Sequence, residues 1–184
     1  MVELKTMIPD IEYDLKYATQ DNFTGKKLYQ DGNFTFLRLL PVLALQKAAQ
    51  DLEKKGYRLK VFDAYRPHSV TITMWNLIQD ERYVANPSKG SGHNRGLSID
   101  LTLIDSTGNE LNMGTSFDHF SDTAHHSFTQ LSPSVLDNRR LLRQTMERYG
   151  FKALATEWWH YSWPNDREYD VLDIPPSKLR ETCH

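Results

Sequence analysis

One stretch of alternating residues limits the fold of this chain more than any other feature. In residues 96–104, leucine and isoleucine alternate with serine, aspartate and threonine, a pattern typical of a β-strand with one buried face. Such a strand needs neighbouring strands and a covering layer of helices to bury its apolar side. The polar side carries the carboxylate of Asp100. The segment therefore predicts an interior sheet with an acidic group on one face.

The rest of the chain supplies the partners that this strand needs. Apolar residues recur at helical spacing in residues 39–55, 70–79 and 132–150, and the last segment opens with Ser132 as a cap and Pro133 in the first turn. Further strands are expected at 58–63 and 152–162, with a hairpin turn at 105–108. This order predicts an α+β fold, with a central antiparallel sheet covered by helices in one domain over residues 1–184.

Composition excludes several classes of partner. Lysine and arginine total 22 against 24 acidic residues, a net charge of −2, so the excess of cations that nucleic-acid binding needs is missing. No run approaches the ~20 apolar residues of a membrane span. The first residues lack the basic and apolar regions of a secretory leader, and the single cysteine, Cys183, allows no internal disulfide. We therefore expect a cytoplasmic protein, with a secreted form whose leader has been removed as the alternative.

Two separate segments carry ligands that zinc prefers. A glycine-bounded loop holds His93 and leads into the strand that carries Asp100, and a second imidazole, His160, follows later in the chain. A catalytic zinc ion takes three protein ligands and leaves a fourth position open to water. A single histidine of this kind is usually an ordinary core or surface residue, but the three groups together predict a zinc site.

A second carboxylate stands close to this predicted site in the sequence. Glu157 precedes His160 by three positions, so in a regular strand the two side chains would point in opposite directions; we therefore expect Glu157 in the loop before the strand. There it could act as a general base and then as a general acid. A rival cluster of ligand types at residues 118–126 lacks periodicity and is expected to be an exposed polar segment.

The same residues carry a family resemblance. The pattern Ser-x-His-x-x-Gly-x-Ala-x-Asp is matched by Ser91, His93, Gly96 and Asp100, with Ser98 in place of the usual alanine, and Glu157, Trp159 and His160 match Glu-x-Trp-His. At these positions the chain resembles the zinc D-alanyl-D-alanine dipeptidases of the VanX type, within the hedgehog-like D,D-peptidases. The resemblance covers roughly residues 14–160 and implies the fold of that group.

The resemblance also implies roles for individual residues. Zinc would be held by His93, Asp100 and His160, with Glu157 as the catalytic base. Arg66 would stabilise the transition state, which agrees with the oxyanion that forms when water attacks a peptide carbonyl; alternatively, Arg66 merely pairs with Asp63 at a strand end. By resemblance alone, the substrate ammonium would be bound by Asp118 with help from Tyr17, and the substrate carboxylate by Ser91.

These roles imply hydrolysis of D-alanyl-D-alanine to two D-alanines. A D,D- or L,D-carboxypeptidase acting on peptidoglycan stem peptides is the nearest alternative, and a non-enzymatic binding domain stabilised by zinc is the alternative of another class. A structural zinc site needs neither Glu157 nor Arg66, which favours the enzyme. The sequence leaves open whether the protein forms a homo-oligomer, and whether it serves vancomycin-type antibiotic resistance or the recovery of D-alanine.

Overall fold

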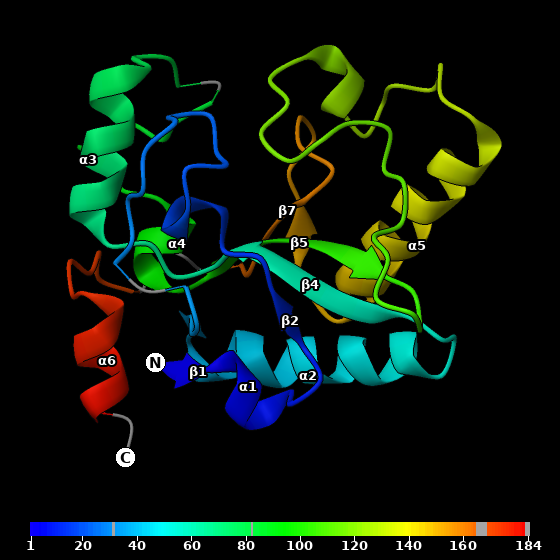
Figure 1. The fold of residues 1–184 in the computed structure, drawn as a ribbon, viewed down its shortest axis with the longest axis horizontal. Helices are drawn as coiled ribbons and strands as arrows, with labels where there is room; N and C mark the ends of the chain where they lie inside the picture. Colours follow the sequence, from blue (N-terminus) through cyan, green and yellow to red (C-terminus); the bar gives the residue numbers. More distant parts are fainter. Residues whose placement is uncertain (31, 82, 165–168, 183–184) are drawn as a thin grey trace.

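A five-stranded sheet runs through the centre of the molecule (Figure 1). The computed structural model describes residues 1–30, 32–81, 83–164 and 169–182, so Cys183 lies outside the described residues. The strand order is β2 (Glu12–Tyr13), β4 (Arg58–Asp63), β5 (Ser98–Ile104), β7 (His160–Ser162) and β6 (Lys152–Ala153). The pairs from β4 to β6 are antiparallel, as expected, and β2 adds a short parallel partner to β4.

Two long helices supply the apolar layer against this sheet. Helix α2 (Leu39–Glu53) packs against β4, and α5 (Pro133–Arg148) packs against β5, β6 and α2. The inward residues of α2 and the apolar residues of β5 belong to one core in which none of these side chains is exposed: Val42, Leu45, Ala48, Leu52, Ile99, Leu101 and Leu103. Burial of each such side chain contributes about 1.5–3 kcal/mol, which fixes the face that β5 turns to the helices.

Most of the remaining elements surround the other face and the ends of the sheet, while the short helix Leu4–Met7 packs against α2. The remaining elements are β1 (Val2–Glu3) paired with β3 (Phe36–Leu37), α1 (Leu4–Met7), α3 (His68–Leu77), α4 (Gly92–Arg95), α6 (Pro176–Thr182) and the 3₁₀ turns Lys16–Ala18 and Asp122–Ala124. All residues of β5 are buried, including the polar ones. Loops therefore cover the acidic face of the sheet. No helix within the described ranges has the length and apolar character that a membrane crossing requires.

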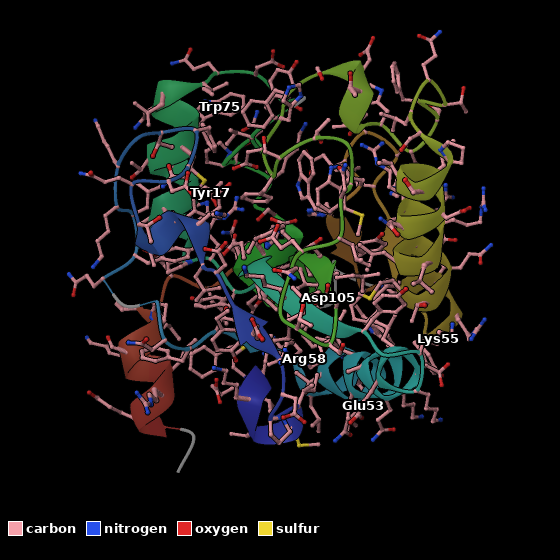
Figure 2. All side chains as sticks on the ribbon, turned by 45° about the vertical axis from the view of Figure 1, so that its right-hand side comes forward. Tyr17, Glu53, Lys55, Arg58, Trp75 and Asp105 are labelled. Atoms are coloured by element: carbon pink, nitrogen blue, oxygen red, sulfur yellow. The ribbon has the colours of Figure 1, made fainter. Side chains whose placement is uncertain are left out.

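The predicted helices are present with ends that differ by one or two residues, and one predicted strand is wrong. Ser132 caps α5 by accepting the amide hydrogen of Val135, and Asp105 closes the turn after β5 by accepting hydrogen bonds from residues 107 and 109 (Figure 2). Residues 152–162 form two short strands joined by a turn, because Leu154 donates its amide hydrogen to the carbonyl of His160. The expected position of Glu157 in the turn before β7 is confirmed.

Candidate metal centre and active site

The predicted metal ligands meet at the centre of the sheet. The antiparallel register of β5 and β7 places Asp100 directly opposite His160. His93 lies on α4, a helix of one turn that Ser91 caps and that ends at Gly96 in a left-handed conformation (φ 70°), which returns the chain into β5. One ligand atom from each of the three side chains lies within 4.8 Å of the others.

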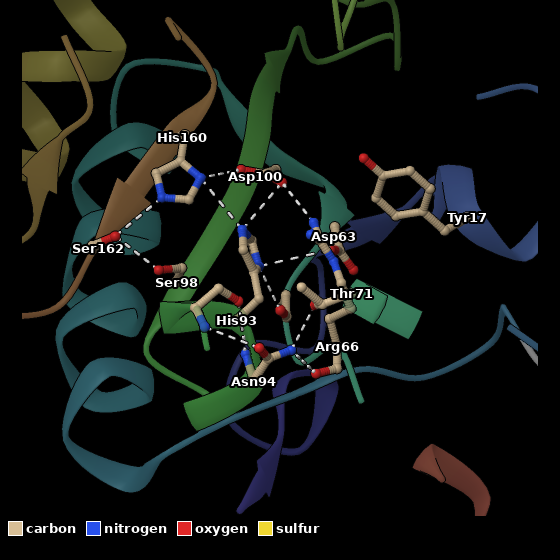
Figure 3. Close-up of polar contacts among 12 residues, drawn as sticks. Tyr17, Asp63, Arg66, Thr71, His93, Asn94, Ser98, Asp100, His160 and Ser162 are labelled. Atoms are coloured by element: carbon tan, nitrogen blue, oxygen red, sulfur yellow. Dashed lines mark hydrogen bonds and ion pairs between the residues drawn. The ribbon is translucent and has the colours of Figure 1, made fainter. Parts of the chain in front are cut away.

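The donor atoms of this cluster have the geometry and chemistry of a zinc site (Figure 3). Nδ1 of His160 lies 2.8 Å from Asp100 Oδ1 and 3.3 Å from Nε2 of His93. The other ring nitrogen of His93, Nδ1, lies 2.7 Å from the carbonyl oxygen of Ala64. A carbonyl only accepts, so Nδ1 carries the proton and the lone pair of Nε2 faces the cluster. Two imidazoles and a carboxylate, oriented in this way, fit a catalytic zinc ion.

Local charges keep the carboxylate of this cluster ionised. Burial acts to raise the pKa of Asp100, but the neighbouring imidazoles of His93 and His160 outweigh it and hold that pKa well below its usual range. Asp100 in turn raises the pKa of His160 against the effect of burial. The carboxylate is therefore an anionic ligand, as zinc requires.

Arg66 brings a fixed positive charge beside this cluster. Its Nε and Nη2 atoms donate hydrogen bonds to Oδ2 of Asp63, at 2.9 and 2.7 Å, and Nη2 lies 3.9 Å from Oδ2 of Asp100. Asp63 is completely buried and also accepts a hydrogen bond from Tyr29. Arg66 therefore does pair with Asp63, and this pair holds the guanidinium beside the cluster.

Glu157 faces the same cluster from the turn before β7. Its Oε2 atom lies 3.8 Å from Nδ1 of His160, and its side chain is 15% exposed. Burial raises the pKa of this carboxyl to about 7. A carboxyl group with a pKa near neutrality is suited to accept a proton from water and then release it.

The predicted substrate-binding residues line the same cavity. The cavity has a volume of about 280 Å³, and it is lined by every residue that the sequence singled out: Tyr17, Arg66, Ser91, His93, Asp100, Asp118, Glu157 and His160. Tyr17 donates a 2.7 Å hydrogen bond to Oδ2 of Asp118. Asp118 has a φ of 54°, and among the described residues no other non-glycine residue has a positive φ. Strain of this kind is typical of functional positions.

Comparison with known proteins identifies the family. A family model described as D-Ala-D-Ala dipeptidase, Peptidase_M15, matches residues 1–174. The chain belongs to this dipeptidase family. It is 38% identical to the D-alanyl-D-alanine dipeptidase of Escherichia coli strain K12, over 94% of this chain and 89% of that protein. It is 34% identical to the enzyme of that name from Enterococcus faecalis, over 86% and 88% of the two chains.

Membership of the dipeptidase family confirms the enzyme class and zinc as the cofactor. A further relative, the D-alanyl-D-alanine dipeptidase of Streptomyces coelicolor, is 32% identical over 92% of this chain and 94% of its own. Among solved structures, the LD-carboxypeptidase LdcB aligns with a TM-score of 0.48 and 19% identity, over 95% of this chain and 72% of that one.

Some residues of the dipeptidase site were missed in the sequence. Asn94 is completely buried and binds the backbone carbonyl of Arg66 and the hydroxyl of Thr71 through its amide nitrogen. Ser162 bonds to the ring of His160. Strand alternation does place Ser162 on the same face as His160, because it lies two residues later, but it does not predict this hydrogen bond. No local signal marks Asn94.

The second group of possible metal ligands, at residues 118–126, does not form a metal site. Within the part of the chain that the structure describes, the His93, Asp100 and His160 cluster is the only set of three or more such ligands close enough to share an ion. The expected exposure holds for His119 and Asp122, but His126 is half-buried, and its ring lies 6.4 Å from that of Tyr161.

The burial of His126 predicts a loss of stability in mild acid. Burial, aided by the nearby Arg143 and Arg139, lowers the pKa of His126 to about 4. The unfolded chain therefore binds a proton near pH 6.5 that the folded chain rejects, so stability present above pH 6.5 is lost as the pH falls toward 4. Between pH 7 and pH 5 the free energy of unfolding should fall in both proteins. We expect this fall to be about 1 kcal/mol smaller in His126→Gln than in the wild type, after allowance for the partial exposure of His126.

Urea unfolding at the two pH values measures this difference. The exposed His119→Gln variant is the matched control and should keep the wild-type dependence. The pH dependence of the metal cluster is common to all three proteins and cancels in the comparison. Equal acid sensitivity of His126→Gln and the wild type would contradict the expectation.

Proposed function

We propose that this protein is a zinc dipeptidase that hydrolyses D-alanyl-D-alanine to two D-alanines. The observation that supports it best is the single cavity in which a zinc-type cluster, a carboxyl with a pKa near 7 and the half-buried carboxyl of Asp118 face one another. A free dipeptide carries an ammonium, a carboxylate and one amide. The cavity offers a complementary group for each of them.

The reacting groups divide the chemistry between them. Zinc held by His93, Asp100 and His160 supplies Lewis-acid activation of water and of the peptide carbonyl. Glu157 accepts a proton as the water oxygen bonds to the carbonyl carbon, and it returns that proton to the amine nitrogen as the carbon–nitrogen bond breaks. Arg66 lies beside the cluster as a fixed cation, and its guanidinium offsets the negative charge that develops on the carbonyl oxygen.

The two ends of the substrate are assigned to residues outside the metal cluster. Tyr17 occupies Oδ2 of Asp118, so we assign the other carboxylate oxygen to the substrate ammonium. Burial raises the pKa of Asp118 well above its ordinary value, and a bound ammonium would compensate the charge that burial disfavours. Ser91 lines the cavity and uses its hydroxyl oxygen as the acceptor of a helix cap, which leaves its hydroxyl proton for the substrate carboxylate.

The rim of the cavity favours a small substrate over a stem peptide. Phe120 lies between two loops, with its ring centroid 4.4 Å from that of Tyr83 and 5.3 Å from that of Phe23. Tyr83 and Phe23 both line the cavity. A carboxypeptidase must leave the amino-terminal side of its substrate open, whereas here Asp118 and the aromatic rim narrow that side.

A panel of alanine peptides tests the proposal. We expect rapid cleavage of D-Ala-D-Ala, and slow or no cleavage of L-Ala-L-Ala, N-acetyl-D-Ala-D-Ala and the D-Ala tripeptide. Asp118→Asn should lower kcat/KM for the dipeptide by about 10²-fold, since it removes one partner of a buried ion pair. Asparagine tolerates a positive φ, so the loop should keep its backbone.

Zinc content measured in parallel separates the outcomes. Asp118→Asn should retain the wild-type stoichiometry, because Asp118 is not among the metal ligands. Rapid cleavage of the acetylated compound would identify a carboxypeptidase, and a zinc-loaded protein that cleaves none of the four would identify a binding domain.

We also propose a cytoplasmic location and a single domain over residues 1–184. A chain with one cysteine is compatible with a reducing compartment, and one apolar core underlies the central sheet. The near-neutral charge gives no support to a nucleic-acid partner.

A further inference from the structure

Two serine hydroxyls lie behind His160, at the ring nitrogen that faces away from Asp100 (Figure 3). Nε2 of His160 lies 3.1 Å from Oγ of Ser162, which in turn lies 2.7 Å from Oγ of Ser98. The register of β5 and β7 pairs Ser98 with Ser162. We propose that this serine pair is a positioning device that fixes the ring and proton of His160 and so raises the zinc affinity of the site.

The position of one proton decides whether His160 can bind a metal. Nδ1 of His160 faces Asp100 and His93, so its lone pair is free for zinc only if Nε2 carries the proton. For His93 a backbone carbonyl fixes the corresponding proton. For His160 the partner is a hydroxyl, which can donate or accept. The partner alone therefore does not select the ring form that binds zinc.

Ser98 gives Ser162 a second partner, so that Ser162 can take the direction that the zinc-binding form of His160 needs, since either serine hydroxyl can donate to the other. The hydroxyl of Ser162 has one proton; when it donates that proton to Ser98, its oxygen is left to accept from Nε2–H of His160. Ser98 is 1% exposed, so solvent can reach this bond only from the side of Ser162, which is partly buried. With the alanine of the family pattern at position 98, Ser162 would lose this acceptor. The substitution that departs from the pattern thus completes a hydrogen-bonded chain to a metal ligand.

The side chain of Ser98 fits only because residue 92 is a glycine. A Cβ atom built on Gly92 would overlap with Oγ of Ser98. Gly92 is not among the glycines with a positive φ, so space rather than backbone conformation demands glycine at this position. Ser98 and Gly92 therefore form a matched pair.

Zinc dissociation constants, measured by competition with a chelator, test the proposal. Loss of an outer hydrogen bond to a metal ligand typically weakens metal binding by about 10–100-fold, and we expect Ser162→Ala to fall in this range. Ser98→Ala should weaken binding less. The double variant should match Ser162→Ala alone, because Ser98 acts through Ser162. Ser162→Thr keeps the hydroxyl and should retain most of the affinity.

Thr102 offers a matched control on the same face of the same strand. Its hydroxyl is completely buried and has no hydrogen-bond partner among the described residues, so Thr102→Val should leave zinc affinity unchanged. Gly92→Ala should weaken zinc binding or folding, and adding Ser98→Ala should relieve most of this loss, since only a tight contact of 3.2 Å with the Cβ of residue 98 remains. The double variant keeps the test usable if the single one does not fold.

Three results would overturn the proposal. They are a Ser162→Ala variant with unchanged zinc affinity, additive losses in the two serine variants, or a rise in KM of the zinc-saturated enzyme as the only effect. The last result would make the serines substrate contacts, since both also line the cavity. The inference rests on His160 as a zinc ligand but not on the identity of the substrate. A wild-type protein that binds zinc and cleaves none of the peptides would therefore rule out the proposed function but not this inference.

Discussion

Replacement of Glu157 by glutamine should abolish hydrolysis while zinc remains bound. Glutamine keeps the size of the side chain but cannot take the proton from water or return it to the leaving amine, and general acid–base catalysis contributes about 10²–10⁴ in rate. We expect kcat for D-Ala-D-Ala to fall toward the upper end of that range, because one carboxyl performs both transfers. The zinc content, measured by atomic absorption, should stay at the wild-type value.

Glu81 provides the control for this substitution. It lines the same cavity but pairs with Lys89 and Asn86 on the exposed loop, so Glu81→Gln should change kcat only slightly. If Glu157→Gln kept more than a tenth of the wild-type rate with zinc bound, another group would have to be the base.

Loss of the Arg66 guanidinium should be the second large effect. Removal of one partner of a developing oxyanion costs about 10²–10³ in kcat, and we expect Arg66→Ala to lose this much activity at unchanged zinc content. The substitution also leaves Asp63 buried without its cation, which costs about 3–5 kcal/mol. We therefore expect a marked fall in the free energy of unfolding as well.

Asp63→Asn separates the two effects of Arg66. This variant keeps the cation near the cluster but loosens it, so its loss of kcat should be smaller than that of Arg66→Ala. Thermal unfolding and steady-state kinetics, run on the same preparations, distinguish stability from catalysis. A rise in KM with kcat unchanged in Arg66→Ala would place the guanidinium in ground-state binding instead.

The cluster of His93, Asp100 and His160 could be predicted only in part from local patterns. Alternation in β5 indicated the face of Asp100. The glycines around His93 indicated a loop, but the structure has the one-turn helix α4 there. The pairing of Asp100 with His160 depends on the register of two strands far apart in the chain, and no local pattern specifies such a register. The family resemblance supplied that information.

The failed predictions have physical reasons of the same kind. Aromatic density in residues 152–162 indicated one continuous strand, but Trp158 and Trp159 are buried in a turn, and burial selects for aromatic residues as strongly as strand formation does. Strand β2 is two residues long, too short to show alternation. The left-handed backbone of Asp118 depends on its surroundings and leaves no mark in its neighbours.

The order in which the ligands appear along the chain has a consequence for biosynthesis. His93 and Asp100 leave the ribosome together, whereas His160 emerges only after α5 and β6 have been made. A nascent chain therefore has only two of the three ligands for much of its synthesis. Tight metal binding becomes possible only after β7 has paired with β5. With the proposed ligand set, we expect zinc to be inserted late in folding, and translation products that stop before His160 should be unable to retain the ion.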